Sequence, residues 1–250
     1  MTLPFFWHPS VAQHGRGDTV RLAGEEGRHA VVVRRVRTGE AVVLTDGTGT
    51  SAKVRVVAVH RTELEALVES VTTTSPELPR VAVAQAVAKG DRGELAVQML
   101  TEIGVDEIVP WAAARSVAVW RGERGAKALT RWRSTAREAA KQSRRAWFPT
   151  VAEPATTEQV ASQLQEASVP VVLHESASGP LADLPVPGRG RIVVVVGPEG
   201  GITEDELAAF AAVGAEPVRL GSSVLRTSTA GVAAVAALLS RTPRWRSTGP

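Results

Sequence analysis

Two glycine-rich stretches are the most informative part of the sequence: Gly197-Pro198-Glu199-Gly200-Gly201 and Leu220-Gly221-Ser222-Ser223-Val224-Leu225-Arg226-Thr227-Ser228-Thr229-Ala230-Gly231. Each lies between a predicted strand and a predicted helix. Glycine in such a loop lets the main chain approach a ligand closely or adopt a positive φ. Ligands of α/β proteins bind at the carboxyl ends of the strands. The two stretches therefore predict one binding site built largely from backbone.

The segments around these loops alternate between strand and helix patterns from residue 80 onward. Valine-rich runs predict strands at 80–87, 105–110, 169–173, 192–196 and 217–220. Helical periodicity predicts helices at 94–103, 126–146, 158–167, 204–213 and 230–239. In the first of these helices, Leu95, Met99, Leu100 and Ile103 share one side, and Gly104 ends the helix. Such alternation predicts an α/β fold, with a mostly parallel sheet and helices on both faces.

The N-terminal part of the chain, to about residue 72, has a different pattern. Short valine-rich runs at 19–22, 41–44, 53–59 and 63–71 predict strands, and the last alternates between apolar and acidic residues. Residues 46–49, Asp-Gly-Thr-Gly, form a strong turn signal. We therefore expect a small β-barrel over 1–72, a proline-containing linker over 73–79, and a second domain over 80–250.

Composition limits the kind of protein this can be. The chain has 250 residues, of which 44% are hydrophobic, enough for a folded core. It has no cysteine, and its five histidines are scattered, so we predict no disulfide and no metal site. No secretory leader is recognisable, and no run reaches the roughly 18 apolar residues of a membrane helix. We expect a cytoplasmic protein.

Charge is distributed unevenly along the chain, although the net charge is only +3. Residues 115–147 carry ten basic and two acidic groups, whereas residues 151–218 carry two basic and ten acidic groups. The predicted helix at 126–146 places Leu129, Trp132, Ala136, Ala139 and Ser143 on one face and Arg133, Arg137, Lys141 and Arg144 on the other. The arginine stripe is either a surface for a polyanion such as RNA or an ordinary solvated face.

The first glycine-rich loop is followed by a helix start signal. Thr203 and Glu206 form a capping box, and the first turn carries three carboxylates. These negative charges disfavour a phosphate ligand, and neither GxxxxGK[ST] nor GxGxxG is present. A cofactor without phosphates, whose adenine is bound in a pocket and by backbone contacts, fits this loop better than a nucleotide does. The alternative is an ordinary tight turn between strand and helix.

The second loop leads into an alanine-rich helix. Ser228 or Thr229 is the expected N-cap. Arg226 stands at the mouth of the expected site, where it either serves the reaction or forms a structural ion pair with Glu199.

Several strings together resemble the ribosomal RNA small subunit methyltransferase E family, a SPOUT-class family of RNA methyltransferases. The resemblance runs in order along nearly the whole chain. It rests on Arg28-His29 with Val33-Arg34-Arg35 and Gly39-Glu40, Lys89-Gly90-Asp91-Arg92, Thr101-Glu102-Ile103-Gly104-Val105, Glu138-Ala139-Ala140-Lys141-Gln142-Ser143 with Arg145, the Gly197–Gly201 loop, and Leu225-Arg226-Thr227 with Thr229-Ala230.

The resemblance implies a PUA-like, RNA-binding N-terminal barrel and a C-terminal SPOUT domain with a deep trefoil knot. It implies a homodimer that methylates uridine N3 in the decoding region of 16S rRNA, within the small ribosomal subunit. S-adenosylmethionine is expected in the knot, lined by Leu173, His174, Glu175, Gly197, Pro198, Glu199, Gly200, Gly201, Leu220, Gly221, Leu225, Arg226, Thr227, Thr229 and Ala230. The expected RNA contacts are Arg28, Arg34, Arg35, Arg133, Arg137, Lys141 and Arg145.

For the reaction, Arg226 is the predicted stabiliser of charge on the uridine, and Glu199 is a candidate proton acceptor. The chain departs from the family at Ser228, where an acidic residue is frequent, so a mechanism that needs a carboxylate there fails. Two other functions stay open: a knotted ribose 2′-O-methyltransferase, and a non-catalytic RNA-binding protein of the same fold.

Overall fold

The computed structural model describes residues 3–88 and 90–246 and divides into two compact units. Unit 1 comprises Met1–Pro76 and Ala140–Phe148, and unit 2 comprises Glu77–Ala139 and Pro149–Pro250. Unit 1 thus includes a segment, Ala140–Phe148, that the sequence pattern placed in the second domain. Across the described residues, no helix combines the length and the apolar character that a membrane crossing requires.

Unit 1 is built on a five-stranded sheet with the order β1-β3-β4-β5-β2. Strand β1 pairs with β3 in parallel, and the other pairs are antiparallel. The predicted alternation is confirmed, because Leu64, Ala66 and Val68 of β5 are all buried. The turn at 46–49 is confirmed as well. The strands are β1 (Phe5–Trp7), β2 (Thr19–Leu22), β3 (Ala41–Thr45), β4 (Thr50–Val59) and β5 (Leu64–Thr73).

Short helical segments complete unit 1, and the sequence pattern gave no sign of them. They are η1 (Val11–Gln13), α1 (Gly24–Arg28) and the π-helical η2 (His29–Val33). Strand β1 was also missed, because its three residues are all aromatic and show neither a valine run nor an alternation.

Unit 2 contains a seven-stranded sheet with the order β10-β12-β9-β11-β6-β7-β8, and every pair is parallel. This confirms the predicted α/β architecture. The strands are β6 (Arg80–Ala86), β7 (Glu107–Trp111), β8 (Thr150–Val151), β9 (Val169–Leu173), β10 (Gly179–Pro180), β11 (Arg191–Val196) and β12 (Pro217–Arg219). A 3₁₀ turn, η3 (Leu181–Asp183), follows β10.

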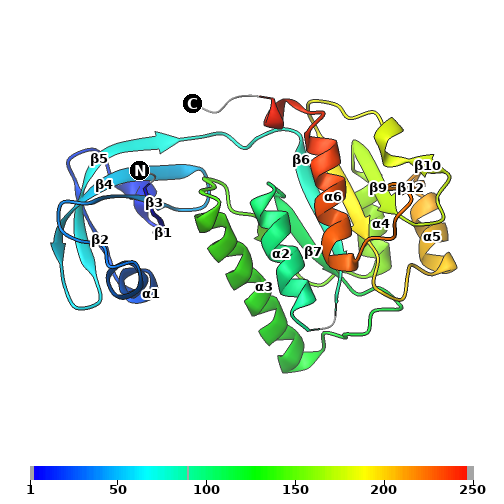
Figure 1. The fold of residues 1–250 in the computed structure, drawn as a ribbon, viewed down its shortest axis with the longest axis horizontal. Helices are drawn as coiled ribbons and strands as arrows, with labels where there is room; N and C mark the ends of the chain where they lie inside the picture. The colour runs from blue at the N-terminus through cyan, green and yellow to red at the C-terminus, as the bar shows by residue number, and fades with distance from the viewer. Residues whose placement is uncertain (1–2, 89, 247–250) are drawn as a thin grey trace. The chain divides into compact units, whose positions relative to one another are not determined.

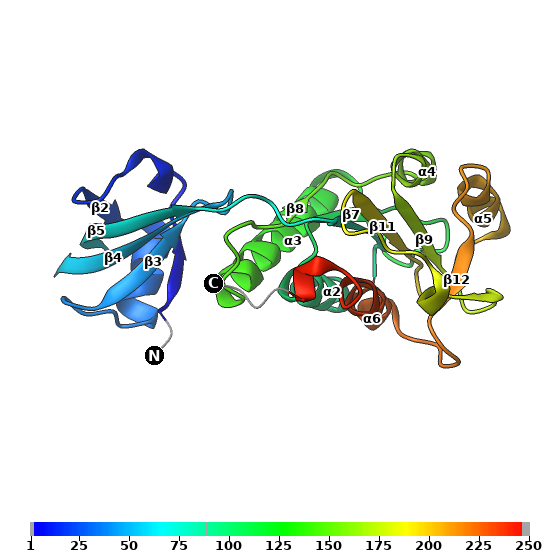
Figure 2. The same ribbon diagram turned by 90° about the horizontal axis from the view of Figure 1, so that it is seen from above.

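Helices cover both faces of this sheet (Figure 2). Residues from α2 (Arg92–Glu102), α3 (Gly122–Gln142) and α6 (Thr227–Leu239) share one buried cluster with alternate strand residues. Residues around α4 (Thr157–Gln165) and α5 (Glu204–Ala211) share the other. Helices α2 and α6 lie side by side (Figure 1).

Two details of the helices were not given by the sequence pattern. Leu95 lies on the predicted apolar side of α2 but is 46% exposed, because α2 buries Ala96, Val97 and Leu100. Helix α3 ends at Gln142 rather than at residue 146.

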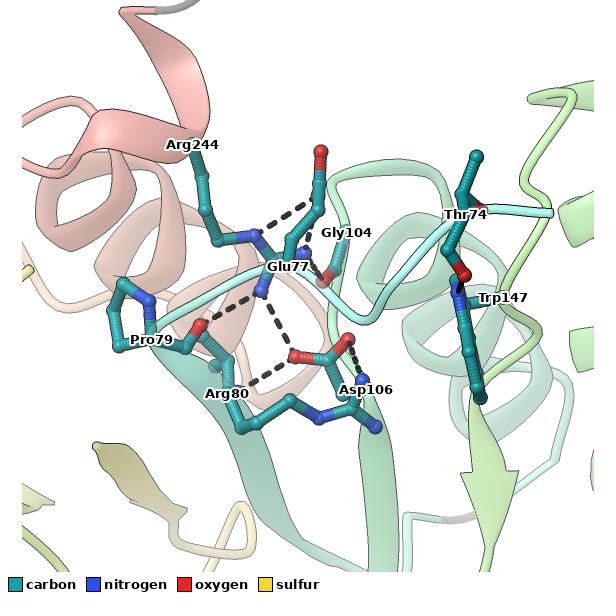
Figure 3. A network of polar contacts seen from close by, with 9 residues as sticks. Thr74, Glu77, Pro79, Arg80, Gly104, Asp106, Trp147 and Arg244 are labelled. Carbon is teal, nitrogen blue, oxygen red and sulfur yellow. Dashed lines mark hydrogen bonds and ion pairs between the residues drawn. The ribbon is translucent and has the colours of Figure 1, made fainter. Parts of the chain in front are cut away.

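The end of unit 2 is held by a buried polar network centred on Arg244, in the short helix η4 (Pro243–Trp245) (Figure 3). The Arg244 guanidinium donates to Asp106 Oδ2 at 2.9 Å, to Pro79 O at 3.0 Å and to Gly104 O at 2.8 Å. It also donates to Glu77 Oε2 at 3.1 Å. The Arg244 and Asp106 side chains are only 4% and 5% exposed. This network ties the segment after α6 to the amino end of β6.

Candidate active site

A cavity of about 580 Å³ opens at the carboxyl edge of the unit 2 sheet. Its walls are the segments that follow β9, β11 and β12, so the two glycine-rich loops do form one site. The expected cofactor residues in the lining are Leu173, His174, Glu175, Gly197, Pro198, Glu199, Gly200, Gly201, Leu220, Gly221, Leu225, Arg226, Thr227 and Ala230. Thr229 is outside the lining, and its hydroxyl donates to Arg226 O at 3.2 Å.

The loop after β11 is tight because it has almost no side chains. Gly201 has a φ of +78°, which favours glycine, and its N–H donates to Pro198 O at 2.9 Å. A Cβ on Gly200 would lie 3.0 Å from Arg115 Cβ. Arg115 Nη1 in turn donates to Gly200 O at 3.2 Å. The loop therefore presents main-chain atoms to the cavity, and Arg115 packs against Gly200 and donates a hydrogen bond to it.

The capping box predicted at the start of α5 is confirmed. Thr203 Oγ1 accepts from Glu206 N–H at 3.3 Å, and Glu206 Oε2 accepts from Thr203 N–H at 2.8 Å. The buried Glu206 carboxylate also accepts from Ala114 N–H at 2.8 Å, which fastens the loop after β7 to α5. Of the three carboxylates in this first turn, only Glu204 lines the cavity.

The second loop begins α6 earlier than expected. The N-cap position is Arg226, which makes no side-chain capping bond, so the prediction of Ser228 or Thr229 as N-cap is wrong. Thr227 and Ser228 are buried in the first turn, at 6% and 5% exposure. The side chain of Gln85 holds this turn, since its Nε2 donates to Thr227 O at 3.2 Å.

Helix α6 packs closely on the sheet because residue 231 is glycine. A Cβ there would lie 3.1 Å from Val196 Cγ2 and 3.3 Å from Leu100 Cδ2. The close approach fixes the second loop beside the first.

Charged side chains surround the cavity. Glu199 pairs with Arg92, with 3.7 Å between Glu199 Oε1 and Arg92 Nη1, and the alternative pairing of Arg226 with Glu199 is absent from the ion pairs of the described residues. Arg226 is exposed at the lining. The lining thus combines arginines with the carboxylates of Glu175, Glu199 and Glu204.

Sequence reasoning missed three of these arginines, Arg92, Arg115 and Arg219. Arg92 ends the string Lys89-Gly90-Asp91-Arg92, which was a usable signal; Lys89 itself lies outside the described residues. Arg115 was counted with the basic segment at 115–147, and nothing in the sequence placed it beside Gly200.

The predicted RNA-contact residues fall in both units. Arg28, Arg34 and Arg35 are exposed in unit 1. Arg145 is also in unit 1 and is half-buried.

Lys141 requires a correction. Its side chain is only 2% exposed and forms an ion pair with Glu26, within unit 1. It therefore does not offer its charge to solvent as the predicted stripe required.

The rest of that stripe is also interrupted. In unit 2, Arg133 donates to Glu153 Oε1 at 2.8 Å and to Val151 O at 3.1 Å, while Arg137 is half-buried. Arg144 lies beyond the end of α3. For metals, the described part of the chain contains no group of three or more His, Asp or Glu side chains arranged to hold an ion.

Comparisons with known proteins agree with this architecture. An RNA methyltransferase domain model matches residues 76–239, and an RNA methyltransferase PUA domain model matches residues 22–69. The fold and the site thus define the class: an RNA methyltransferase domain preceded by a PUA domain.

Individual relatives are more specific. A protein from Mycobacterium bovis named ribosomal RNA small subunit methyltransferase E is 45% identical, over 92% of this chain and 89% of its own length. The Bacillus subtilis protein of that name is 32% identical over 94% of both chains. A crystal structure of the Neisseria gonorrhoeae protein of that name, bound to S-adenosyl methionine, superposes with a TM-score of 0.87 at 31% identity, covering 96% of this chain and 98% of that one. The chain belongs to the ribosomal RNA small subunit methyltransferase E family.

Proposed function

We propose that this protein transfers a methyl group from S-adenosylmethionine to N3 of a uridine in the decoding region of 16S ribosomal RNA. The observation that carries the proposal is the backbone-lined cavity at the carboxyl edge of the unit 2 sheet. The Neisseria gonorrhoeae relative, similar over nearly its whole length, was solved with S-adenosyl methionine bound.

The cavity fits that cofactor in size and chemistry. Its volume of about 580 Å³ lies within the range of small-molecule sites. The glycine loops offer backbone donors and acceptors to an adenosine, and carboxylates such as Glu175, Glu199 and Glu204 suit a ligand with a positive sulfonium. When bound, the cofactor supplies an activated methyl group. The residues that hold it in this proposal are those of the lining, without Thr229.

The residues at the cavity mouth act on the uridine. Uridine N3 carries a proton at neutral pH, and its removal spreads negative charge over O2 and O4. The Arg226 guanidinium, at the rim, stabilises that charge or positions the base. Glu199 accepts the proton in this scheme, and Arg92 at 3.7 Å orients its carboxylate.

The path of the C-terminal segment supports the trefoil knot that forms part of this proposal. Strand β12 lies beyond β9 in the sheet, yet α6, which follows it, packs on β11, β6 and α2. The segment between β12 and α6 therefore returns toward the middle of the sheet, as a trefoil knot would require.

We also propose a homodimer that acts in the cytoplasm, where ribosomal subunits are. Val224 and Leu225 are 79% and 37% exposed at the cavity rim, and a second copy covers such apolar side chains. Sedimentation of the purified protein should give twice the monomer mass. A monomer at micromolar concentration would remove this part of the proposal.

The methylation itself is tested with small ribosomal subunits from a strain that lacks the modification. Purified protein and labelled S-adenosylmethionine are incubated with the subunits or with free 16S rRNA, and the RNA is digested to nucleosides. The expected product is labelled N3-methyluridine. A ribose-methylated nucleoside would reassign the reaction to 2′-O-methylation. Cofactor binding without incorporation into either RNA would indicate a binding protein.

A further inference from the structure

A second, smaller cavity lies entirely within unit 1. Its volume is about 70 Å³, and its polar lining comes from His29, Arg34, Lys141, Gln142 and Arg144. Residues 3–6 complete the wall. Two strings that carry the family resemblance meet here, although they are more than a hundred residues apart in sequence: His29 and Arg34 belong to one, Lys141 and Gln142 to the other, and Arg144 follows the second.

The charge of this cavity is positive. Lys141 is neutralised by Glu26, whose other oxygen, Oε2, accepts from Trp7 N–H at 3.0 Å. Within the described residues, the guanidinium groups of Arg34 and Arg144 have no ion-pair partner, and the lining contains no carboxylate. Both arginines are exposed. The two guanidinium groups are therefore available to an anion.

The backbone at Arg144 ends α3 in a conformation that is unusual for arginine. Arg145 N–H donates to Ala140 O at 2.9 Å, and Arg144 N–H donates to Lys141 O at 3.1 Å. This is the bond pattern of a Schellman turn, in which glycine is preferred at the position of Arg144. Arg144 nevertheless occupies it with a φ of +57°.

The other side of the cavity has a similar backbone feature. Arg35, directly after Arg34, has a φ of +54°, and these two arginines are the non-glycine residues with positive φ in the described chain. Helix C-termini attract cations, which explains basic residues near both turns but not arginine in a left-handed conformation. Strained backbone of this kind clusters at functional sites.

We propose that Arg34 and Arg144 clamp one backbone phosphate of the RNA substrate in this cavity. The inference rests on the proposed function and extends it to a second contact, remote from the methyl-transfer site in sequence. The cavity is far smaller than the cofactor cavity, so it suits a phosphate group rather than a whole nucleoside. Arginine forks match phosphate geometry and bind it in a bidentate manner.

The test measures RNA affinity of the full-length protein between 50 and 200 mM salt, with 16S rRNA as the probe. The variants are Arg34→Ala and Arg144→Gly, and Arg61→Ala, an exposed arginine of unit 1 outside the cavity, is the matched control. Each cavity variant should lower the affinity about tenfold and reduce the slope of log K against log salt by about 0.7–0.9. The control should change neither.

Two further readouts separate binding from folding and from catalysis. Arg144→Gly removes the strained side chain, so its melting temperature should equal or exceed that of the wild type, and S-adenosylmethionine affinity should be unchanged. A lower melting temperature together with weaker RNA binding would assign Arg144 a structural role and overturn the proposal. Wild-type affinity and salt slope in both variants would overturn it too.

Inorganic phosphate is the second probe, followed through the guanidinium NMR signals of Arg34 and Arg144. Perturbation of both signals supports the clamp when the variants also bind RNA more weakly. Perturbation with unchanged RNA binding would make this a site for free phosphate and refute the RNA contact. If the wild type methylates rRNA and both variants bind RNA normally, the phosphate contact is refuted and the proposed function stands. If the wild type neither binds nor methylates rRNA, the proposed function fails as well.

Discussion

Replacing Arg244 by methionine tests how the end of unit 2 is held. Methionine keeps most of the aliphatic length of the side chain but removes every donor. The change leaves Asp106 buried without its main cationic partner, while Asp106 still accepts from Val81 N–H at 2.8 Å and lies 3.3 Å from Arg80. It also leaves Pro79 O and Gly104 O without their donor.

The expected loss follows from burial. Breaking a buried ion pair by removing one partner costs about 3–5 kcal/mol. The remaining contacts of Asp106 place the expected loss near the lower end of that range, at about 3 kcal/mol. The contact with Glu77 adds little, because the Glu77 side chain is 64% exposed. For a chain of this size, about 3 kcal/mol lowers the melting temperature by roughly 6–12 °C.

The assay is denaturant and thermal unfolding at fixed protein concentration, with Arg246→Met as the control. Arg246 is exposed two residues further on, so its replacement should change the free energy of unfolding by less than about 0.5 kcal/mol. If Arg244→Met were as stable as Arg246→Met, the network would contribute nothing and the reasoning would be refuted.

Three further predictions concern the site and unit 1. Arg226→Ala should lower kcat by about 10²–10³-fold, as measured by single-turnover methylation at saturating S-adenosylmethionine; full activity would remove Arg226 from the mechanism. Gly200→Ala should weaken cofactor binding about tenfold, because the new Cβ meets Arg115, whereas Gly179→Ala, with open space around it, should bind normally. Burial lowers the pKa of His8, so folding stability should fall as the pH drops below about 6.5, where the unfolded chain takes up the proton first. His8→Gln should reduce that loss in unfolding experiments between pH 5 and 7, and an unchanged pH profile would contradict the assignment.

Local patterns were sufficient for the place of the site and for the strands other than β1, β8 and β10. Buried parallel strands read as continuous valine runs, so β9 was predicted with its observed bounds, 169–173. The capping box at Thr203 and Glu206 is likewise a local signal, and both of its hydrogen bonds form.

Features that depend on tertiary contacts were not predictable in this way. Lys141 has the spacing of an exposed stripe, but its burial depends on Glu26, which lies more than a hundred residues earlier. The N-cap of α6 was misplaced because Ser228 is buried by packing rather than used for capping. Arg115 reaches the first glycine loop only through the folded chain.

The most direct test of the central claim is a crystal structure of this protein with S-adenosylmethionine. We expect density for the cofactor in the cavity between the Gly197–Gly201 loop and residues 220–230, with its methyl group facing Arg226. Density at another place, or an empty cavity at saturating cofactor, would contradict the account.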